Sequence, residues 1–194
     1  MNTDNLKLFA EHTEQEYPKE ACGFLISIKG KEKYLPAKNI AINNSDHFII
    51  DPHSYIEAED SGDILAICHS HPNIGCEPSQ ADKVACETSN KPWYILSWPG
   101  NNLFTLYPND YKAPLLGRRF SYGILDCYTL IIDYFKRNTD IIIDYVETEN
   151  EWWDKGKNLY VDNFEEQGFV EINNPSDVRL HDVFLIQLVS PVPN

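Results

Sequence analysis

An apolar stretch that ends in two histidines, ILAICHSH (64–71), constrains the fold of this chain more than any other feature. Its apolar first half predicts a buried strand, and Pro78 and Ser79 predict the start of a helix over SQADKVACETS. Two histidines at positions i and i+2 of a strand point to the same face. We therefore expect His69 and His71 to lie side by side, at the end of a strand and shortly before a helix.

Helical and strand patterns alternate along the rest of the chain. Helices are expected over residues 4–17, from Pro52 onward, over 126–135 and over about 159–167, and strands over 23–28, 33–37, 47–51, 93–98, 102–107 and 183–189. Residues 108–116 contain two prolines and no periodicity, which indicates a linker between two domains.

Composition excludes several classes of protein. The 194 residues are 42% hydrophobic and 12% aromatic, which is enough to build a core for one large or two small domains. No stretch approaches the ~20 apolar residues of a membrane span, and the first residues lack the pattern of a signal peptide. A net charge of -14 argues against nucleic-acid binding. Five cysteines without C-x-x-C spacing predict buried thiols in a reducing cytoplasm.

The spacing H-x-H-x7-S-x2-D predicts a metal site. His69 and His71 can reach one ion from a shared strand face, and Asp82, one turn into the next helix, can supply an oxygen ligand. Three protein ligands of this kind leave the fourth tetrahedral position for water, as in catalytic zinc sites, and zinc lowers the pKa of its water to about 7. The sequence therefore predicts a catalytic Zn²⁺ site.

Two further residues complete a candidate hydrolytic site. Glu20 is the candidate general base, which would pass a proton from water to the leaving amine, and Ser79 the candidate hydrogen-bond donor to the oxyanion. Structural alternatives exist, because S-x-x-acid is also the pattern of a helix capping box, a lone histidine is usually structural, and Glu20 can be a solvated residue. The other N-terminal histidines, which are His12, His47 and His53, are interpreted as non-ligands.

The pattern E…H-S-H-P-x6-S-x2-D and the segment PKEACGFLIS resemble the JAMM metalloproteases over roughly residues 5–107. The resemblance implies an α/β fold with a curved mixed sheet flanked by helices, and zinc-dependent cleavage of peptide or isopeptide bonds. Under it, Glu20, His69, His71, Ser79 and Asp82 have the roles given above.

A second candidate site surrounds Cys127, at the expected start of an amphipathic helix. The unpaired N–H groups at a helix N-terminus stabilise a thiolate, so a lowered pKa is expected for Cys127. The alternative is a buried structural cysteine in the first turn.

The segment Y-G-x-x-D-C-Y-T-L-I-x-D-Y, together with WWDKGKNLY, resembles the nucleophile region of NlpC-type cysteine peptidases. The resemblance implies a papain-like α+β domain that cleaves the peptide stem of bacterial peptidoglycan, with Cys127 as nucleophile. The catalytic histidine of that family is expected beyond Asn194, and His181 is not interpreted as a substitute. We therefore expect an incomplete cysteine site, in a fragment, a chain completed by a second polypeptide, or a degenerate domain.

The order of the two segments resembles the tail assembly proteins of the lambda-like tail-tip family. It implies a zinc peptidase domain over 1–107, a linker over 108–116 and an incomplete cysteine peptidase domain over 117–194. Expected partners are other tail-tip proteins, a peptide or isopeptide substrate and peptidoglycan, with location in the host cytoplasm during assembly and then in the virion tail. Two alternatives stay open, which are an intracellular JAMM isopeptidase acting on a ubiquitin-like protein and a non-enzymatic structural component of the tail.

Overall fold

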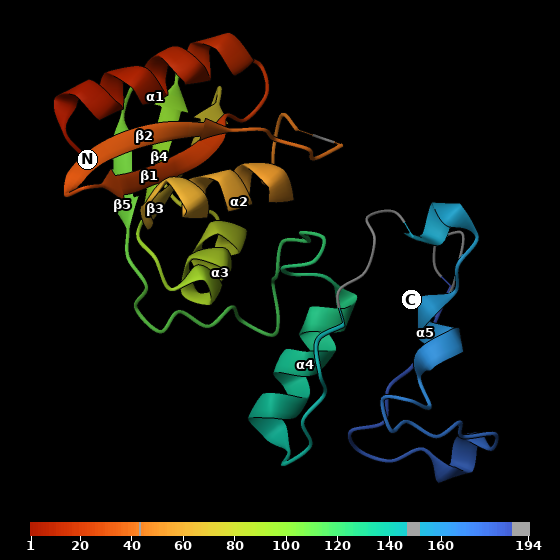
Figure 1. Cartoon of the computed structure of the whole chain (residues 1–194). Helices are drawn as coiled ribbons and strands as arrows, with labels where there is room; N and C mark the ends of the chain where they lie inside the picture. Colours follow the sequence, from red (N-terminus) through yellow and green to blue (C-terminus); the bar gives the residue numbers. More distant parts are fainter. Residues whose placement is uncertain (43, 147–151, 188–194) are drawn as a thin grey trace. The chain divides into compact units, whose positions relative to one another are not determined.

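The computed structural model describes residues 1–42, 44–146 and 152–187 of the 194-residue chain (Figure 1). The chain forms two compact units, Met1–Ala113 and Pro114–Asn194, which we call unit 1 and unit 2 and describe separately. Of the described residues, none belongs to a helix with the length and apolar character needed to cross a membrane.

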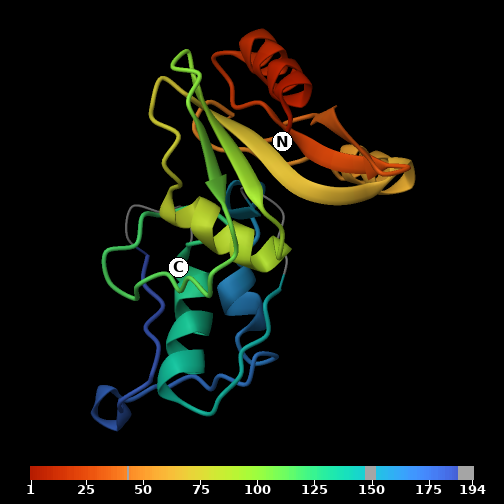
Figure 2. The same ribbon diagram turned by 90° about the vertical axis from the view of Figure 1, so that its left-hand side faces the viewer.

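Unit 1 is built on one five-stranded sheet in the order β2-β1-β3-β4-β5. The strands are β1 (Cys22–Ile28), β2 (Lys31–Ala37), β3 (Asp63–Pro72), β4 (Trp93–Trp98) and β5 (Leu103–Leu106). The β3–β4 pair is parallel and the other pairs are antiparallel. A parallel pair requires a crossover connection, and a helix supplies it between β3 and β4. The sheet is strongly twisted (Figure 2).

Three helices cover the two faces of this sheet. They are α1 (Thr3–Glu16), α2 (Pro52–Ser61) and α3 (Gln80–Ser89). Figure 1 shows α1 on one side of the sheet and α2 and α3 on the other. Unit 1 is therefore a three-layer α/β domain, and the expected mixed sheet flanked by helices is confirmed.

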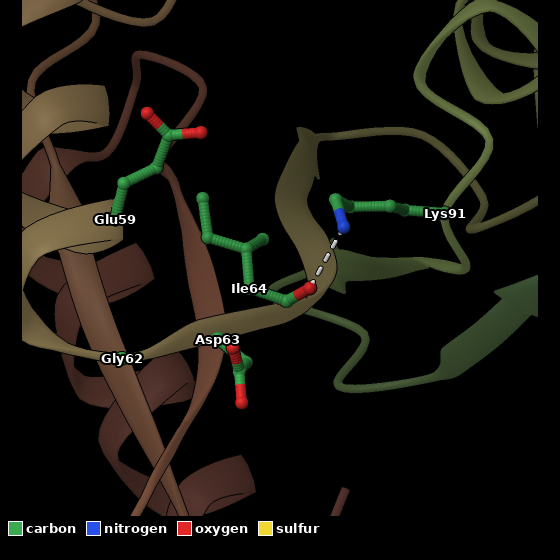
Figure 3. A pocket seen from close by; sticks show the side chains of 5 residues that line it. All are labelled: Glu59, Gly62, Asp63, Ile64 and Lys91. Carbon is green, nitrogen blue, oxygen red and sulfur yellow. Dashed lines mark hydrogen bonds between the residues drawn. The ribbon is translucent and has the colours of Figure 1, made fainter.

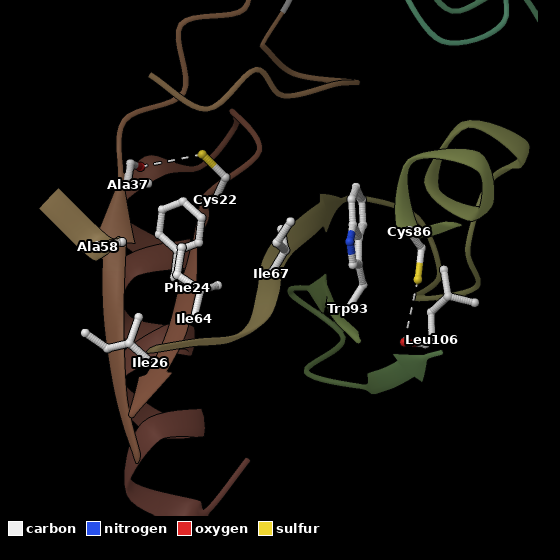
Figure 4. Packing of buried hydrophobic residues seen from close by; sticks show 10 residues of the cluster. All are labelled: Cys22, Phe24, Ile26, Ala37, Ala58, Ile64, Ile67, Cys86, Trp93 and Leu106. Carbon is white, nitrogen blue, oxygen red and sulfur yellow. Dashed lines mark hydrogen bonds between the residues drawn. The ribbon is translucent and has the colours of Figure 1, made fainter. Parts of the chain in front are cut away.

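Two apolar clusters fill the space between the layers. Under α1, Phe9 packs with Leu25 and Tyr34. On the opposite face, Phe24 and Trp93 belong to a cluster of ten buried residues (Figure 4), namely Cys22, Phe24, Ile26, Ala37, Ala58, Ile64, Ile67, Cys86, Trp93 and Leu106. The expected role of cysteines as small buried residues is confirmed for Cys22, Cys68 and Cys86, whereas Cys76 is half-buried and Cys127 is exposed.

A cavity of about 240 Å³ opens at the start of β3, lined by Glu59, Gly62, Asp63, Ile64 and Lys91 (Figure 3). The ammonium group of Lys91 donates a hydrogen bond to the carbonyl of Ile64 at 2.9 Å. His71 lies at the other end of the same strand, about 23 Å away at 3.3 Å per residue. The cavity is therefore separate from the histidines of β3.

The predicted linker, residues 108–116, has no regular secondary structure. Its first half nevertheless has fixed partners, because the carboxylate of Glu87 on α3 accepts hydrogen bonds from the backbone N–H groups of residues 109, 110 and 111, at 2.7, 3.2 and 3.1 Å. The ammonium group of Lys83 lies 5.4 Å from the centre of the Tyr111 ring. The chain is thus held against α3 as it leaves β5.

Unit 2 contains α4 (Cys127–Asn138), α5 (Leu159–Asn163) and the 3-10 turns η1 (Trp152–Lys155) and η2 (Pro175–Asp177). Across the described parts of this unit, 114–146 and 152–187, β pairing is limited to an isolated bridge between Ser121 and Leu125. Its buried apolar side chains include Leu125, Phe135 and Trp152. The α+β character expected of unit 2 stays a prediction.

Three expected elements differ from the structure. Residues 47–51 form no strand, and only an Asn39–Ile50 bridge lies there, because side-chain hydrogen bonds of Asn39 shape this segment as a loop. The strand expected over 183–189 is absent from residues 183–187, and residues 188–189 lie outside the described part. The helix expected over about 159–167 ends at Asn163.

Candidate metal centre

Strand β3 places His69 and His71 on one face of the sheet, deep inside unit 1. His69 is fully buried and His71 is 4% exposed. The β1–β3 pairing sets Cys22 opposite His69, so the start of β1 runs beside both histidines. The predicted alternation of side chains along the strand is therefore observed, and it places both imidazoles in a site that is almost fully buried.

The ligand atoms of three side chains converge at this point. Nε2 of His69 and Nε2 of His71 are 3.1 Å apart, and they lie 3.3 and 3.4 Å from Oδ1 and Oδ2 of Asp82. Zinc bound tetrahedrally at about 2.0–2.2 Å separates neighbouring ligand atoms by about 3.3–3.6 Å. The observed separations of 3.1–3.4 Å are close to this range, so the three side chains can share one tetrahedral ion. Histidine, cysteine and acidic side chains are the usual metal ligands. Among those in the described residues, His69, His71 and Asp82 are the group of three whose ligand atoms all lie within 4.8 Å of one another.

Burial and mutual contacts shift the pKa values of all three side chains. Burial opposes ionisation of Asp82, but the two imidazoles and the N–H of Ser79 outweigh it and hold the pKa of Asp82 well below its usual value. Burial lowers the pKa of His69, although Asp82 acts in the opposite direction. Burial also disfavours the charged form of His71, but hydrogen bonds to Asp82 and to the carbonyl of Gly75 raise its pKa. An ionised carboxylate facing two imidazoles suits a divalent cation.

Hydrogen bonds orient two of the three side chains. Ser79 and Asp82 form a capping box at the start of α3, in which Ser79 N–H donates to Oδ2 of Asp82 at 2.7 Å and Asp82 N–H donates to Oγ of Ser79 at 3.0 Å. Nδ1 of His71 lies 2.9 Å from the carbonyl oxygen of Gly75, as is usual for a metal-binding imidazole. The capping box and the ligand set thus share one carboxylate.

Glu20 lies at the entrance to β1, and only 4% of its surface is exposed. Its position depends on Ser70, the residue between the two histidines. Ala21 N–H donates to Oγ of Ser70 at 2.8 Å, and Ser70 N–H donates to the carbonyl of Ala21 at 2.9 Å. Burial raises the pKa of Glu20 to about 8, with His71 opposing the shift and Asp82 and Asp46 adding to it. Glu20 therefore binds a proton more tightly than an ordinary glutamate side chain does.

Ser79 is exposed, and its hydroxyl oxygen accepts the N–H of Asp82. The structural alternative considered for this residue, a helix cap, is thus present. The cap does not conflict with an oxyanion-binding role, because accepting one hydrogen bond uses a lone pair and leaves the hydroxyl hydrogen as donor. The oxyanion role stays a prediction.

Ser70, Gly75 and Phe48 belong to the surroundings of this site and were not predicted from the sequence. Ser70 alternates with the histidines, so its position on the opposite face of the strand could have been predicted from the sequence. Phe48 stacks on the ring of His69, with ring centres 4.7 Å apart. Its place in an irregular loop gives no periodic signal.

The histidines interpreted as non-ligands have other surroundings. Nδ1 of His12 lies 2.8 Å from the hydroxyl of Tyr34, and His47 lies 3.2 Å from the carboxylate of Asp46. His53 is exposed in the first turn of α2. None of the three is part of the converging group found among the described residues.

Cys127 begins α4 in unit 2, as expected, but the predicted lowering of its pKa is wrong. Partial burial and the neighbouring Asp126 raise the pKa of Cys127. Asp126 is the N-cap, and its carboxylate accepts the N–H groups of Thr129 and Gly123 at 2.9 and 2.8 Å. The helix N–H groups expected to stabilise a thiolate are thus partly occupied by a negative side chain. Nδ1 of His181 contacts the hydroxyl of Tyr134, seven residues and about 10 Å along α4 from Cys127.

Comparisons with known proteins show a family match over residues 3–107 and relatives that match most of the chain. Residues 3–107 match the family model for prokaryotic homologs of the JAB domain. The chain is 35% identical over 177 residues to tail tip assembly protein K of Escherichia phage N15, covering 90% of this chain and 72% of that protein. It is 34% identical over 145 residues to tail tip assembly protein K of Escherichia phage lambda, covering 75% and 69%.

A solved structure of a protein from Desulfitobacterium hafniense is also similar, with 24% identity, a TM-score of 0.45 and coverage of 54% of this chain and 78% of that one. The family assignment does not depend on this likeness. The chain belongs to the prokaryotic JAB family and, by its relatives, to the family of tail tip assembly proteins K. The resemblances to the JAMM proteins and to the lambda-like tail-tip family are thereby confirmed.

Proposed function

We propose that this chain takes part in phage tail-tip assembly and that unit 1 is a zinc-dependent peptidase acting on a peptide or isopeptide bond. The observation that carries the proposal is the convergence of His69, His71 and Asp82 within 3.1–3.4 Å of one another, with Glu20 buried beside them. The names of the relatives support the assembly role.

His69, His71 and Asp82 would hold the zinc ion through Nε2, Nε2 and a carboxylate oxygen. When bound, zinc supplies Lewis-acid polarisation of the scissile carbonyl and acidifies a water molecule. The chain itself keeps both imidazoles fixed and excludes bulk water, because the two histidines are almost fully buried. Such a dry site strengthens every electrostatic interaction within it.

Glu20 is the proposed general base. With a pKa of about 8, its carboxylate takes a proton from the attacking water and then holds it for transfer to the leaving amine. The bonds between Ala21 and Ser70 keep the start of β1 against β3, so the carboxylate and the histidines belong to one rigid sheet. The hydroxyl of Ser79 is the proposed hydrogen-bond donor to the oxyanion.

For unit 2 we propose an NlpC-type cysteine peptidase domain directed at bacterial peptidoglycan, with Cys127 as its nucleophile. The proposed division is 1–107, a linker over 108–116 and 117–194. Cys127 has a raised pKa, and His181 is engaged with Tyr134, so nothing in the described surroundings of the thiol activates it. We expect no muropeptide hydrolysis by this 194-residue chain. Turnover that disappears in Cys127→Ala would contradict this expectation.

The proposed partners are other tail-tip proteins, met in the host cytoplasm during assembly and then in the virion tail. The test is complementation of a phage that lacks this gene with the wild-type chain, Glu20→Gln or the matched control His12→Gln. Mass spectrometry of the tail proteins then identifies cleaved termini.

We expect one or more cleavages in the wild type and the control, and a rate about 10²–10⁴-fold lower in Glu20→Gln. The same termini, formed equally fast with Glu20→Gln, would overturn the peptidase role.

A further inference from the structure

Two aromatic rings, those of Phe48 and Trp93, contact the imidazole of His69. The Phe48 ring stacks on the imidazole with a centre-to-centre distance of 4.7 Å and an interplanar angle of 27°. Trp93 meets the same imidazole edge-on, at 5.3 Å and 78°, and Phe48 and Trp93 contact each other at 5.6 Å. The imidazole of His69 is therefore confined by two larger rings as well as by its own strand.

The two histidines of the centre are held in different ways. Nδ1 of His71 has a hydrogen-bond partner in the carbonyl of Gly75, at 2.9 Å. Nδ1 of His69 is buried, and no residue in the described part of the chain forms a hydrogen bond with it. Metal-binding histidines are usually oriented by a hydrogen bond at the nitrogen that does not bind the metal. Since His69 lacks that bond, its ring orientation must come from packing.

The loop that carries Phe48 is fixed by one side chain. The amide nitrogen of Asn39 donates to the carbonyls of Glu20 and His47 at 3.0 and 3.3 Å. The amide oxygen of Asn39 accepts the N–H groups of Ala41 and Ile49 at 3.0 and 3.1 Å. Asn39 thus binds the residues on both sides of Phe48 and, at the same time, the backbone of the candidate base.

The loop is also joined to Glu20 directly, because Glu20 N–H donates to the carbonyl of Asn44 at 2.6 Å. The segment therefore touches the site at two points, at the backbone of Glu20 and at the ring of His69. The amide of Asn39 forms hydrogen bonds at both points, with the backbone of Glu20 and with the backbone on either side of Phe48.

From these contacts we propose that Phe48 is a positioning residue, which holds the imidazole of His69 in its metal-binding orientation in place of the missing hydrogen bond, and that Asn39 fixes Phe48 and Glu20 relative to each other. This inference rests on the proposed metal centre. Phe48 touches neither metal nor substrate in this account, and acts only through His69.

The test is zinc affinity of the full chain, measured by competition with a chromophoric chelator. Phe48→Ala is expected to raise the Kd for Zn²⁺ about 10–100-fold, as for the loss of other groups that orient metal ligands. Phe48→Tyr, which keeps the ring, is expected to restore the wild-type Kd. Phe104→Ala is the matched control, because Phe104 lies on β5 and is 36% exposed.

Cobalt substitution gives a second readout that general destabilisation does not reproduce. Displacement of His69 changes the visible ligand-field spectrum of bound Co²⁺ in Phe48→Ala, whereas Phe48→Tyr and Phe104→Ala keep the wild-type spectrum. If Phe48→Ala fails to fold, Phe48→Leu replaces it, since leucine keeps apolar volume but cannot stack, and the same loss of affinity is expected.

The outcomes separate the two proposals. A wild-type chain that binds no Zn²⁺ would overturn the metal centre itself. A wild-type chain that binds Zn²⁺, together with a folded Phe48→Ala or Phe48→Leu variant whose Kd stays within twofold of it, would overturn the positioning role alone.

Discussion

In unit 1 the reactive side chains lie inside the protein, whereas in unit 2 the candidate nucleophile lies at the surface. Glu20, His69, His71 and Asp82 are each at most 8% exposed, and Cys127 is exposed. The buried groups lie on or next to a five-stranded sheet and a capped helix, whereas Cys127 lies on a single helix. Burial of charge costs free energy, so it requires a scaffold that supplies partners for each group.

The two candidate sites also differ in how their surroundings shift the pKa values of the candidate residues. In unit 1 burial raises the pKa of Glu20, and the neighbouring imidazoles hold the pKa of Asp82 below its usual value against the effect of burial. In unit 2 the neighbouring carboxylate of Asp126 works against a thiolate at Cys127. Substitutions in the two units test this contrast, and their expected effects range from several kcal/mol to a small shift in one pKa.

The largest expected difference is in core stability. Phe24→Ala removes a fully buried ring from the sheet of unit 1 and is expected to cost about 3–5 kcal/mol of unfolding free energy. Phe184→Ala, the same substitution in unit 2, removes a ring that is 69% exposed and is expected to change stability by about 0.5 kcal/mol or less. Urea denaturation followed by circular dichroism measures both, and equal losses would break the comparison.

The second expected effect is a pH dependence that originates at Glu20. A buried carboxyl whose folded pKa is about 8 binds a proton more tightly in the folded than in the unfolded chain. Its stabilising contribution is therefore complete below the ordinary glutamate pKa and is lost as pH rises through about 8.

The measurement compares wild type with Glu20→Gln between pH 5 and 9 in the presence of a chelator. The wild type is expected to lose about 3–5 kcal/mol relative to the variant over this range. A difference that does not change with pH would show that Glu20 is not buried as described.

A smaller effect is expected at Ser79, because its hydroxyl caps α3. Ser79→Ala should cost about 0.5–2 kcal/mol of stability. Ser79→Asn, which keeps a capping oxygen, should recover most of that loss but not any loss of peptidase rate. Recovery of the rate as well would assign Ser79 to capping alone.

The smallest effect is expected at Asp126. Asp126→Asn keeps a capping side chain but removes the charge beside Cys127, so the pKa of the thiol should fall. The pH dependence of Cys127 alkylation, in a chain whose half-buried Cys76 is replaced by serine, measures the shift. An unchanged profile would mean that burial alone sets this pKa.

Local patterns in the sequence were sufficient to predict two parts of the centre. The pair His69 and His71 follows from strand alternation, and the approach of Asp82 follows from the cap that Ser79 forms at the next helix. Both depend on residues close together in the chain. The helix over Thr3–Glu16 and the strands around the histidines were predictable for the same reason.

The position of Glu20 and the shape of the loop around Phe48 depend on contacts between segments that are distant in the sequence. Glu20 reaches the histidines only through the pairing of β1 with β3, about fifty residues apart, and its place just before an expected strand, not periodicity, pointed to it. The loop around Phe48 was mistaken for a strand because its apolar residues suggest one, whereas the side chain of Asn39 takes up its N–H groups. The pKa of Cys127 was wrongly predicted because the effects of partial burial and of the charged N-cap Asp126 were left out.

The central claim is that His69, His71 and Asp82 hold one divalent ion. The most direct measurement is the zinc content of the full chain after metal-replete purification, for the wild type, His71→Ala and the matched control His12→Ala. We predict about one zinc ion per chain in the wild type and the control, and none in His71→Ala. Zinc absent from the wild type, or retained in full by His71→Ala, would contradict the account.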